Sequence, residues 1–463
     1  MIIIAFALAW HVLVFLKMPH LTWIPAFMNT WFYDKGLLYY KDFIQLHFPI
    51  PHMVAYPLLK LTNWDILKEP FLALFTAILT TLILYKIAQK YLAPPARTAV
   101  LVFFSLLFWY SSTWVQYSGE SITGLFLLIT VFLLIRLANP FLIGIFFSLT
   151  ELTGQIVTPT LIALFILYTI RLFTAPKTKP FKSLIYFLLG SLVPIAITSA
   201  YFFLKGTFTD FFFWTVTYYL TYAKLAKAGI GSLPWKDIVL VFSPALFVLV
   251  ALIRKKKRDW ISLVLVTAIF SSIPFVVGSI FHPHHYLFIL PVASLAFGKA
   301  MGTDRSRLLI GFFIYMTVFI FYPWYSYRLT RGPANQNLND VSKDPQMQEL
   351  VGEIKQKSQS KGIIVVGDPL IYYFSDTLPT NKYFMALPWH YIPLTETKKI
   401  FDSKPPHLWI IDTGYMKRFY ESWKTPEVGN FIKDQISGCY RKVYESQPWE
   451  IWQRKSSCSS RSE

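Results

Sequence analysis

The chain has 463 residues, of which 54% are hydrophobic, 18% aromatic and only 15% charged. A soluble domain usually has about a quarter of its residues charged, so this composition excludes an ordinary soluble globule and indicates a lipid environment. The formal net charge of +19 could suggest a nucleic-acid partner. We expect none, because many basic residues form short clusters between apolar runs, as in membrane proteins with many spans.

Apolar runs that could cross a bilayer recur along the chain. A spanning helix needs about 17–25 residues, and the shorter runs leave the count open by one or two. The sequence predicts about eleven transmembrane helices. They are expected at 2–16, 70–85, 98–109, 122–137, 141–152, 156–170, 184–204, 238–253, 261–280, 286–297 and 308–322.

Basic residues follow every second predicted span, most clearly in the run RKKKR at 254–258. Basic loops face the cytoplasm. The N-terminus is therefore predicted to be cytoplasmic, and the loop 17–69 and the C-terminal region to be extracytoplasmic. Lys255 is then inside and Asp368 outside. We expect a multi-pass protein of a bacterial plasma membrane.

The loop 17–69 is far longer than a connection requires, which usually marks a functional segment. Its stretch 35–57, KGLLYYKDFIQLHFPIPHMVAYP, carries acids, histidines and aromatic residues, which hold ligands or move protons. The alternative is an interfacial loop with aromatics between lipid and water. Pro49, Pro51 and Pro57 argue against a regular helix through it.

Further acids stand near predicted spans. Glu120 lies at the start of one span, and Glu151 lies between two apolar segments, where an ionised group costs about 2.5–3.5 kcal/mol to insert. The plainer explanations are a solvated helix start favoured by the dipole for Glu120 and an interfacial turn for Glu151. For Asp34 the plainer explanation is a solvated turn formed with Lys35 and Gly36.

The segment 281–286, FHPHHY, has three histidines beside a tyrosine. Their spacing does not fit one helix face and no cysteine is near, so the sequence predicts no metal site and gives no support for a divalent metal or another cofactor. His284 and His285 could instead bind a phosphate or a lipid headgroup. An interfacial loop is the alternative.

The composition becomes polar after about residue 325. A helix is predicted from Met347, Leu350, Val351 and Ile354 at helical spacing, with buried strands at 362–366 and 407–412 and a hairpin at 441–444 and 450–452. We therefore expect a transmembrane domain at 1–325, a small extracytoplasmic α/β domain at 326–454 and a disordered tail at 455–463. The two cysteines, Cys439 and Cys458, permit a disulfide.

Nucleotide-binding motifs are missing from the sequence: there is no GxxxxGK[ST] and no GxGxxG between a strand and a helix. No predicted cytoplasmic loop is long enough for a nucleotide-binding domain. A nucleotide-driven pump and a cytoplasmic sugar-nucleotide enzyme are therefore disfavoured.

In their order along the chain, these features resemble the GT-C class of membrane glycosyltransferases, and more narrowly the bacterial relatives of dolichyl-phosphate-mannose protein mannosyltransferases (glycosyltransferase family 39-like). The resemblance covers nearly the whole chain. It is carried by a Gly-x-x-Tyr-Tyr-x-Asp-Phe…His-x-Pro pattern, by the acids near later spans, by a Pro-His-His-Tyr-Leu…Leu-Pro element and by IIVVGD. The matching residues are Gly36, Tyr39, Tyr40, Asp42, Phe43, His47 and Pro49, then 283–291 and 363–368.

The resemblance implies transfer of a hexose, mannose for example, from a polyprenyl-phosphate donor to an extracytoplasmic lipid, glycan or protein, in contact with membrane lipids and without a nucleotide. It implies a carboxylate base, for which the candidates are Asp42, Asp34 and Glu120. Candidates for holding the donor phosphate are His284, His285, Tyr286 and Lys41. Candidates for binding substrate are Tyr40, His47, Glu151 and Gln155.

One departure from the family pattern matters. Members usually carry an acid about a dozen residues before the loop glycine, where this chain reads TWIP at 22–25. Either Asp42 or Asp34 replaces it, or the donor chemistry has changed, or the protein is inactive. The alternative functions are a transporter or flippase of a lipid-linked glycan and a non-catalytic scaffold. No internal repeat is evident and the acids lie at span ends, which favours the enzyme.

Overall fold

The computed structural model describes residues 2–112, 115–175, 179–218, 220, 246, 259–278, 283–301, 321–329, 340–359, 361–382, 394–417 and 426–458. The chain divides into two compact units. A helical unit comprises Met1–Trp23, His47–Tyr201 and Gly229–Leu338, and an α/β unit comprises Ile24–Leu46, Phe202–Ala228 and Asn339–Glu463.

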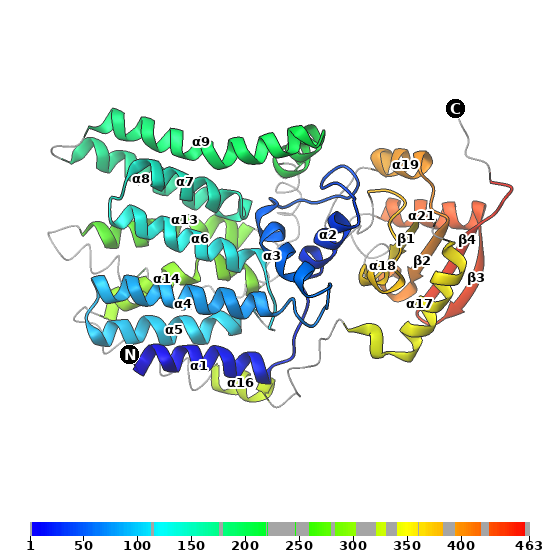
Figure 1. Cartoon of the computed structure of the whole chain (residues 1–463), viewed down its shortest axis with the longest axis horizontal. Helices are drawn as coiled ribbons and strands as arrows, with labels where there is room; N and C mark the ends of the chain where they lie inside the picture. The colour runs from blue at the N-terminus through cyan, green and yellow to red at the C-terminus, as the bar shows by residue number, and fades with distance from the viewer. Residues whose placement is uncertain are drawn as a thin grey trace. The chain divides into compact units, whose positions relative to one another are not determined.

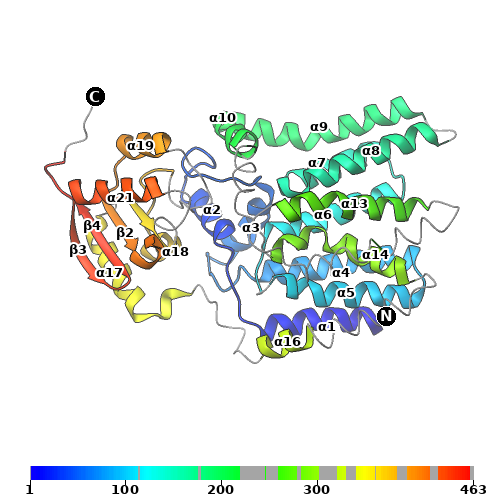
Figure 2. The same cartoon turned by 180° about the vertical axis from the view of Figure 1, so that it is seen from behind.

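Long apolar helices form the helical unit, in which α4, α5 and α14 lie side by side (Figures 1 and 2). The apolar helices are α1 (Ile2–Lys17), α4 (Phe71–Tyr91), α5 (Pro94–Ser112), α6 (Gly119–Ile135), α7 (Pro140–Glu151), α8 (Thr158–Thr174), α9 (Pro180–Leu204), α13 (Trp260–Gly278) and α14 (Leu290–Met301). Shorter elements are α3 (Ile50–Leu61), η1 (Gln155–Val157), η4 (Pro283–Phe288) and α16 (Tyr322–Leu329).

Each predicted span within the described residues corresponds to one of these helices. The span expected at 238–253 has only residue 246 within the described part of the chain. The span expected at 308–322 has only its last two residues there. The span expected from Tyr286 begins only at Leu290, because Pro283–Phe288 forms a 3₁₀ turn. Among the described residues, three helical segments are long and apolar enough to cross a membrane: Phe71–Tyr91, Gln155–Thr174 and Pro180–Leu204.

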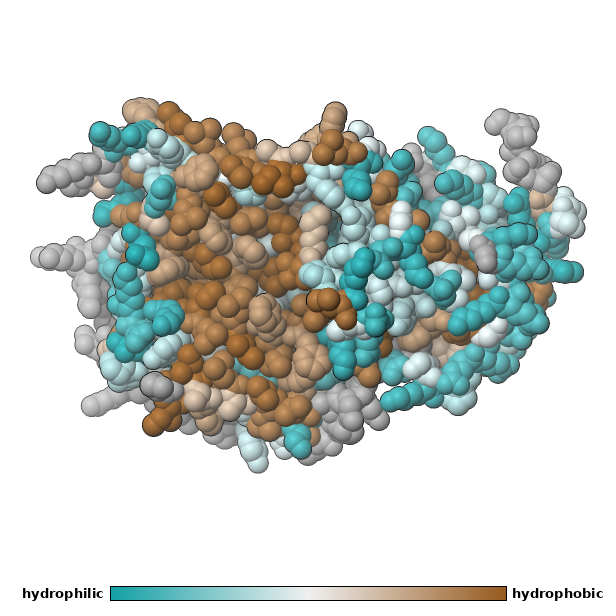
Figure 3. Space-filling model, viewed as in Figure 1, coloured by the Kyte–Doolittle hydropathy of each residue, from teal (hydrophilic) through white to brown (hydrophobic). Residues whose placement is uncertain are grey.

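The face of the helical unit seen in Figure 3 is apolar across its middle. On α9, for example, Phe181 is 71% exposed and Ile197 is 67% exposed. A continuous apolar surface of this kind is costly in water and suits the hydrocarbon of a bilayer. The protein is therefore a multi-pass α-helical membrane protein.

Two glycines allow α7 and α9 to touch backbone to backbone. A Cβ atom on Gly144 would lie 2.0 Å from the carbonyl oxygen of Phe187, and one on Gly190 would lie 2.0 Å from that of Phe141. Small residues at such crossings let membrane helices pack closely, where the hydrophobic effect contributes little.

We expect Gly144→Ala to destabilise the protein by about 1–3 kcal/mol, because the added methyl group has no space and the helices must separate. Gly352→Ala is the matched control, since a Cβ atom there meets nothing within 4 Å. This control should be neutral or stabilising by about 0.5–1 kcal/mol, as alanine is favoured over glycine in a helix. Thermal unfolding in detergent measures both, and equal melting temperatures would contradict the packing argument.

The prolines were expected to prevent a helix in the stretch 35–57, and this expectation is wrong for the end of that stretch. Residues Ile50–Leu61 form α3, with Pro51 in the first turn and Pro57 inside the helix. A proline in the first turn loses no hydrogen bond, because its N–H would have no partner within the helix. Pro57 is tolerated at the cost of one intrahelical bond, and α3 continues to Leu61.

A four-stranded sheet forms the centre of the α/β unit, in the order β1-β2-β4-β3. The strands β1 (Ile363–Val366) and β2 (Leu408–Asp412) are parallel, and β4 (Trp449–Arg454) pairs antiparallel with β2 and with β3 (Tyr440–Ser446). The helices of this part are α17 (Pro345–Ser358), α18 (Leu370–Ser375), α19 (Leu394–Ser403), α20 (Thr413–Met416) and α21 (Pro426–Cys439). The predicted strands, hairpin and helix are confirmed.

The segment Ile24–Leu46 of the long loop belongs to this unit. Its helix α2 (Ile24–Asp34) places Phe27 and Trp31 against Tyr373 of α18. Lys35 forms an ion pair with Asp376 at 2.7 Å. This segment is therefore an ordered part of the α/β unit. The domain boundaries expected at 325 and 326 stay a prediction.

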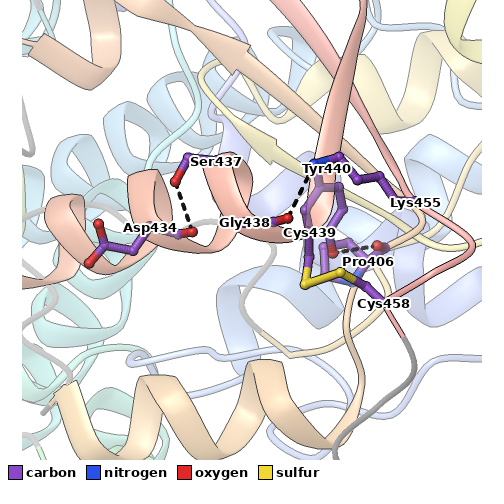
Figure 4. The surroundings of a disulfide bond; sticks show 8 residues. All are labelled: Pro406, Asp434, Ser437, Gly438, Cys439, Tyr440, Lys455 and Cys458. Atoms are coloured by element: carbon purple, nitrogen blue, oxygen red, sulfur yellow. Dashed lines mark hydrogen bonds between the residues drawn. A yellow bond between two sulfur atoms is a disulfide. The ribbon is translucent and has the colours of Figure 1, made fainter.

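A disulfide joins the end of α21 to the C-terminal segment (Figure 4). It links Cys439 to Cys458, and the N–H of Lys455 donates to the carbonyl oxygen of Cys439 at 2.9 Å. The tail expected to be disordered from residue 455 is therefore tied to the domain as far as Cys458, because a covalent bond holds it. Residues 459–463 lie outside the described part of the chain.

Candidate functional site

Glu120 lies in the first turn of α6, at a well-capped helix start. The hydroxyl of Ser118 accepts a hydrogen bond from the N–H of Ser121 at 3.3 Å. A carboxylate in the first turn is stabilised by the helix dipole. Local sequence therefore fixes where this acid stands, and its side chain is only 16% exposed.

The turn η4 brings two histidines to Glu120. Gly124 makes this possible, because a Cβ atom there would lie 2.5 Å from the carbonyl oxygen of Leu287. The Nε2 atom of His285 is 3.9 Å from a carboxylate oxygen of Glu120. One ligand atom from each of Glu120, His284 and His285 lies within 4.8 Å of the others, and we call these three residues the Glu–His cluster.

The beginning of α3 is held against the beginning of α6. The hydroxyl of Tyr117 donates to the carbonyl oxygen of Pro51 at 2.7 Å. The ring of Trp23 stacks on His52 with centroids 5.5 Å apart and meets Tyr117 edge-on at 5.7 Å. These contacts position His47, three residues before α3, so that the charges of Glu120 and His284 act on it.

Burial lowers the pKa of three histidines here, His47, His52 and His284. It lowers the pKa of His284 to about 4 and that of His52 to about 3. His47 is still reached by water, yet the protein encloses it closely enough that desolvation lowers its pKa too. His284 is therefore neutral near pH 7 and gives a bound phosphate no charge assistance, because a desolvated imidazole loses its proton. It can still donate one N–H.

Glu69, which the sequence analysis did not select, is a further acid in this unit. Its side chain is fully buried, and its Oε1 atom accepts a hydrogen bond from the N–H of Trp23 at 3.2 Å. Its Oε2 atom has no partner among the described residues. Burial raises the pKa of Glu69 well above its usual value. Its position directly before an apolar run was the available sequence signal.

Glu151 and Gln155 flank the turn between α7 and α8. The hydroxyl of Thr158 donates to Glu151 at 2.6 Å, and Gln155 is buried. A Cβ atom on Gly154 would lie 3.1 Å from the hydroxyl of Thr123, one turn beyond Glu120. The turn therefore packs against the start of α6, and the roles of both residues in binding substrate stay predictions.

Four predicted residues lie in the α/β unit. The Oδ2 atom of half-exposed Asp42 accepts a hydrogen bond from the N–H of Leu38 at 2.8 Å. Tyr40 is fully buried against Phe202 and Phe211, so its ring supports the loop from inside. Lys41 is exposed, and Asp34 is half-exposed at the end of α2. Their predicted roles stay predictions.

Tyr286 follows the two histidines in η4, and its side chain is 1% exposed. His282 lies outside the described residues. The structure thus brings together Glu120, His284, His285 and His47 in the helical unit. The other candidates, Asp34, Tyr40, Lys41 and Asp42, belong to the α/β unit.

Comparison with solved structures identifies the fold. ArnT from Cupriavidus metallidurans bound to undecaprenyl phosphate has a TM-score of 0.55 at 12% identity, with 98% of each chain covered. The archaeal oligosaccharyltransferase AglB from Archaeoglobus fulgidus, in complex with an inhibitory peptide and a dolichol-phosphate, has a TM-score of 0.52 at 10% identity, with 98% of this chain and 74% of that chain covered.

A mycobacterial arabinofuranosyltransferase, AftD, has a TM-score of 0.54 at 12% identity, with 97% of this chain and 41% of that chain covered. No family model matches the sequence, and the comparison with curated proteins gave no match. The chain therefore has the GT-C fold of membrane glycosyltransferases, as its sequence motifs predicted.

Proposed function

We propose that this protein is a membrane glycosyltransferase that moves a sugar from a polyprenyl-phosphate donor to an extracytoplasmic acceptor. The observation that carries the proposal is the Glu–His cluster at one end of α6, within the fold shared with ArnT and AglB. ArnT is described with undecaprenyl phosphate and AglB with a dolichol-phosphate, which supports a lipid phosphate as the leaving group here.

The reaction is a direct displacement. An acceptor hydroxyl or amine attacks the anomeric carbon, the bond from that carbon to the phosphate oxygen breaks, and the lipid phosphate leaves with the electron pair. The acceptor's proton passes to a carboxylate, for which we propose Asp42. One Asp42 oxygen is already held by the N–H of Leu38, which fixes the carboxylate in one orientation.

The leaving phosphate needs donors that stabilise its charge. We propose His284 and His285 for this task, with Lys41 and Tyr286 as further donors. Because His284 is neutral, it contributes an N–H and not a positive charge. We propose that the transferred sugar is a hexose such as mannose and that the acceptor is a lipid, a glycan or a protein. A transfer assay identifies both.

A transporter of a lipid-linked glycan is the alternative, and a scaffold is the third candidate. Transporters usually bind their cargo near the bilayer midplane between related halves. Here the candidate residues stand at helix starts and in the turn before α14, which favours the enzyme. Membranes containing the protein, incubated with a panel of radiolabelled polyprenyl-phosphate sugars, should release the lipid phosphate and label an acceptor. Movement of intact donor across vesicles without transfer would establish the alternative.

The proposed topology places the N-terminus in the cytoplasm and the α/β unit outside. A disulfide between Cys439 and Cys458 suits an oxidising compartment, which supports this orientation. Both native cysteines are paired, so single added cysteines can be labelled selectively.

We expect a cysteine at Lys361, an exposed residue shortly before Asp368 in the sequence, to react with an impermeant maleimide in intact cells. A cysteine at Lys255 should react only after the cells are opened, because it lies in the basic run that predicts a cytoplasmic loop. Labelling of position 255 from outside would reverse the orientation.

A further inference from the structure

Trp23 is a half-buried aromatic residue next to Glu120, and the proposed reaction gives it no role. Its ring stacks on His52 with centroids 5.5 Å apart and meets Tyr117 edge-on at 5.7 Å. A Cβ atom on Gly119, the residue before Glu120, would lie 3.0 Å from the Cη2 atom of the indole. The ring of Trp23 therefore packs directly against the start of α6, where Glu120 stands.

The backbone of Trp23 is held by a buried acid. Its N–H donates to the Oε1 atom of Glu69 at 3.2 Å, and the side chain of Glu69 is fully buried. The Oε2 atom of Glu69 has no hydrogen-bond partner among the described residues. Burying a carboxyl group with one oxygen unpaired costs free energy, and a main-chain carbonyl could hold the same N–H without that cost. Departures of this kind are expected at functional sites.

We infer that Trp23 binds the sugar of the donor through its aromatic ring, and that Glu69 is the positioning residue that sets this ring in place. Both roles rest on the proposed transfer reaction and deepen it, since they belong to the same site. The faces of a sugar ring carry C–H groups, and ligand sites are lined mainly by aromatic and apolar side chains that pack on such faces. A few polar groups beside them then fix the orientation of the ligand.

The neighbours of Trp23 favour the donor sugar over the acceptor. The ring packs on Gly119, and the next residue, Glu120, has a carboxylate oxygen 3.9 Å from the Nε2 atom of His285. His284 and His285 are the groups proposed to hold the lipid phosphate. In the donor the sugar is bonded directly to that phosphate. A ring next to the phosphate site therefore meets the donor sugar first.

An interfacial tryptophan is the competing explanation, since such residues often lie between lipid and water. An interfacial ring needs only an apolar neighbour and a wet edge. Trp23 instead packs on His52 and Tyr117, which are both fully buried, and its N–H is bonded to a buried acid. A ring fixed in this way suits the recognition of a ligand in one orientation better than contact with mobile lipid.

The test measures the KM of the donor and the inhibition constant of the bare polyprenyl phosphate for each variant in membranes. The donor is the radiolabelled polyprenyl-phosphate sugar that gives the fastest transfer, so donor and inhibitor differ only in the sugar. Trp23→Ala should raise the donor KM by at least about tenfold, as is usual when a tryptophan packed on a ligand is truncated, and leave the inhibition constant within about twofold. Trp23→Phe keeps an aromatic face and should raise the donor KM less.

Glu69 is tested by two substitutions that differ in one acceptor atom. Burial raises the pKa of Glu69 well above its usual value, so the neutral acid holds Trp23. Glu69→Gln keeps an acceptor oxygen and should leave the donor KM and the pH profile of transfer unchanged. Glu69→Leu removes the acceptor and should raise the donor KM by about fivefold or more, since a buried N–H then loses its partner. Loss of transfer in Glu69→Gln would make Glu69 a base and overturn its positioning role.

Trp64→Ala is the matched control. Trp64 is another half-buried tryptophan of the helical unit, packs on Tyr56 at 6.0 Å and is not a proposed site residue, so its loss should leave the donor KM unchanged. Where Trp23→Ala does not insert, Trp23→Phe and Glu69→Leu provide the same comparison. An unchanged donor KM in the Trp23 variants, or equal rises in the donor KM and the inhibition constant, would overturn the inference and leave the glycosyltransferase upheld. Absence of transfer by the unmodified protein with every donor would overturn the proposed function itself and the inference with it.

Discussion

Asp42→Asn should reduce sugar transfer by about a hundredfold to ten-thousandfold, the usual cost of losing a general base. The amide oxygen can still accept the hydrogen bond from the N–H of Leu38, so the turn at 38–42 should keep its shape. The substitution therefore removes the base and leaves the fold. The measurement is the initial rate of transfer in membranes with equal amounts of inserted protein.

Asp65→Asn is the matched control for this variant. Asp65 also lies in the first loop, and its Oδ1 atom accepts a hydrogen bond from the N–H of Leu67 at 2.9 Å. It carries the same charge and caps a comparable turn, but it is not a proposed site residue. Near-normal turnover in Asp42→Asn would exclude Asp42 as the base and direct the same test to Asp34 and Glu120.

The long helices could be predicted from the sequence because a bilayer imposes a simple rule. Backbone polar groups must pair within the segment, so an apolar run of sufficient length becomes a helix. The strands at 363–366 and 408–412 were equally predictable, since short runs of branched and aromatic residues end at Gly or Asp. Both kinds of element depend on local sequence alone.

The Glu–His cluster was only partly predictable. Each of its residues was selected from the sequence, but separately, because only neighbouring residues were compared with one another. The carboxylate comes from Glu120, far from His284 along the chain, and the two meet through the close packing at Gly124. Contacts between distant segments have no signature in local spacing.

Glu69 and Pro51 show two other limits. A single acid before a span is common, and only the fold reveals that Glu69 is buried against the backbone of Trp23. Pro51 argues against a helix by its residue type alone, but a proline is compatible with a helix when it falls in the first turn, as Pro51 does in α3. In both cases the structural role of the residue depends on the position at which the helix starts. A shift of that position by one turn would change the role.

Replacing both His284 and His285 with alanine should weaken donor binding by tenfold or more and leave acceptor binding nearly unchanged. The two side chains are the groups we propose to donate hydrogen bonds to the lipid phosphate. Loss of hydrogen bonds to a charged group costs about 1.5–3 kcal/mol each, which is about tenfold or more in affinity. Burial of both rings is only partial, so the variant should still insert.

The measurement is the initial rate against donor concentration at saturating acceptor, followed by the reverse experiment. The expected result is a rise in KM for the donor with little change in KM for the acceptor. His52→Ala is an informative comparison, because its fully buried ring packs on Trp23 beside the site without belonging to the cluster. An unchanged donor curve with a shifted acceptor curve would place η4 on the acceptor side of the reaction. The phosphate would then have to be held by other donors, of which Lys41 is the first to test.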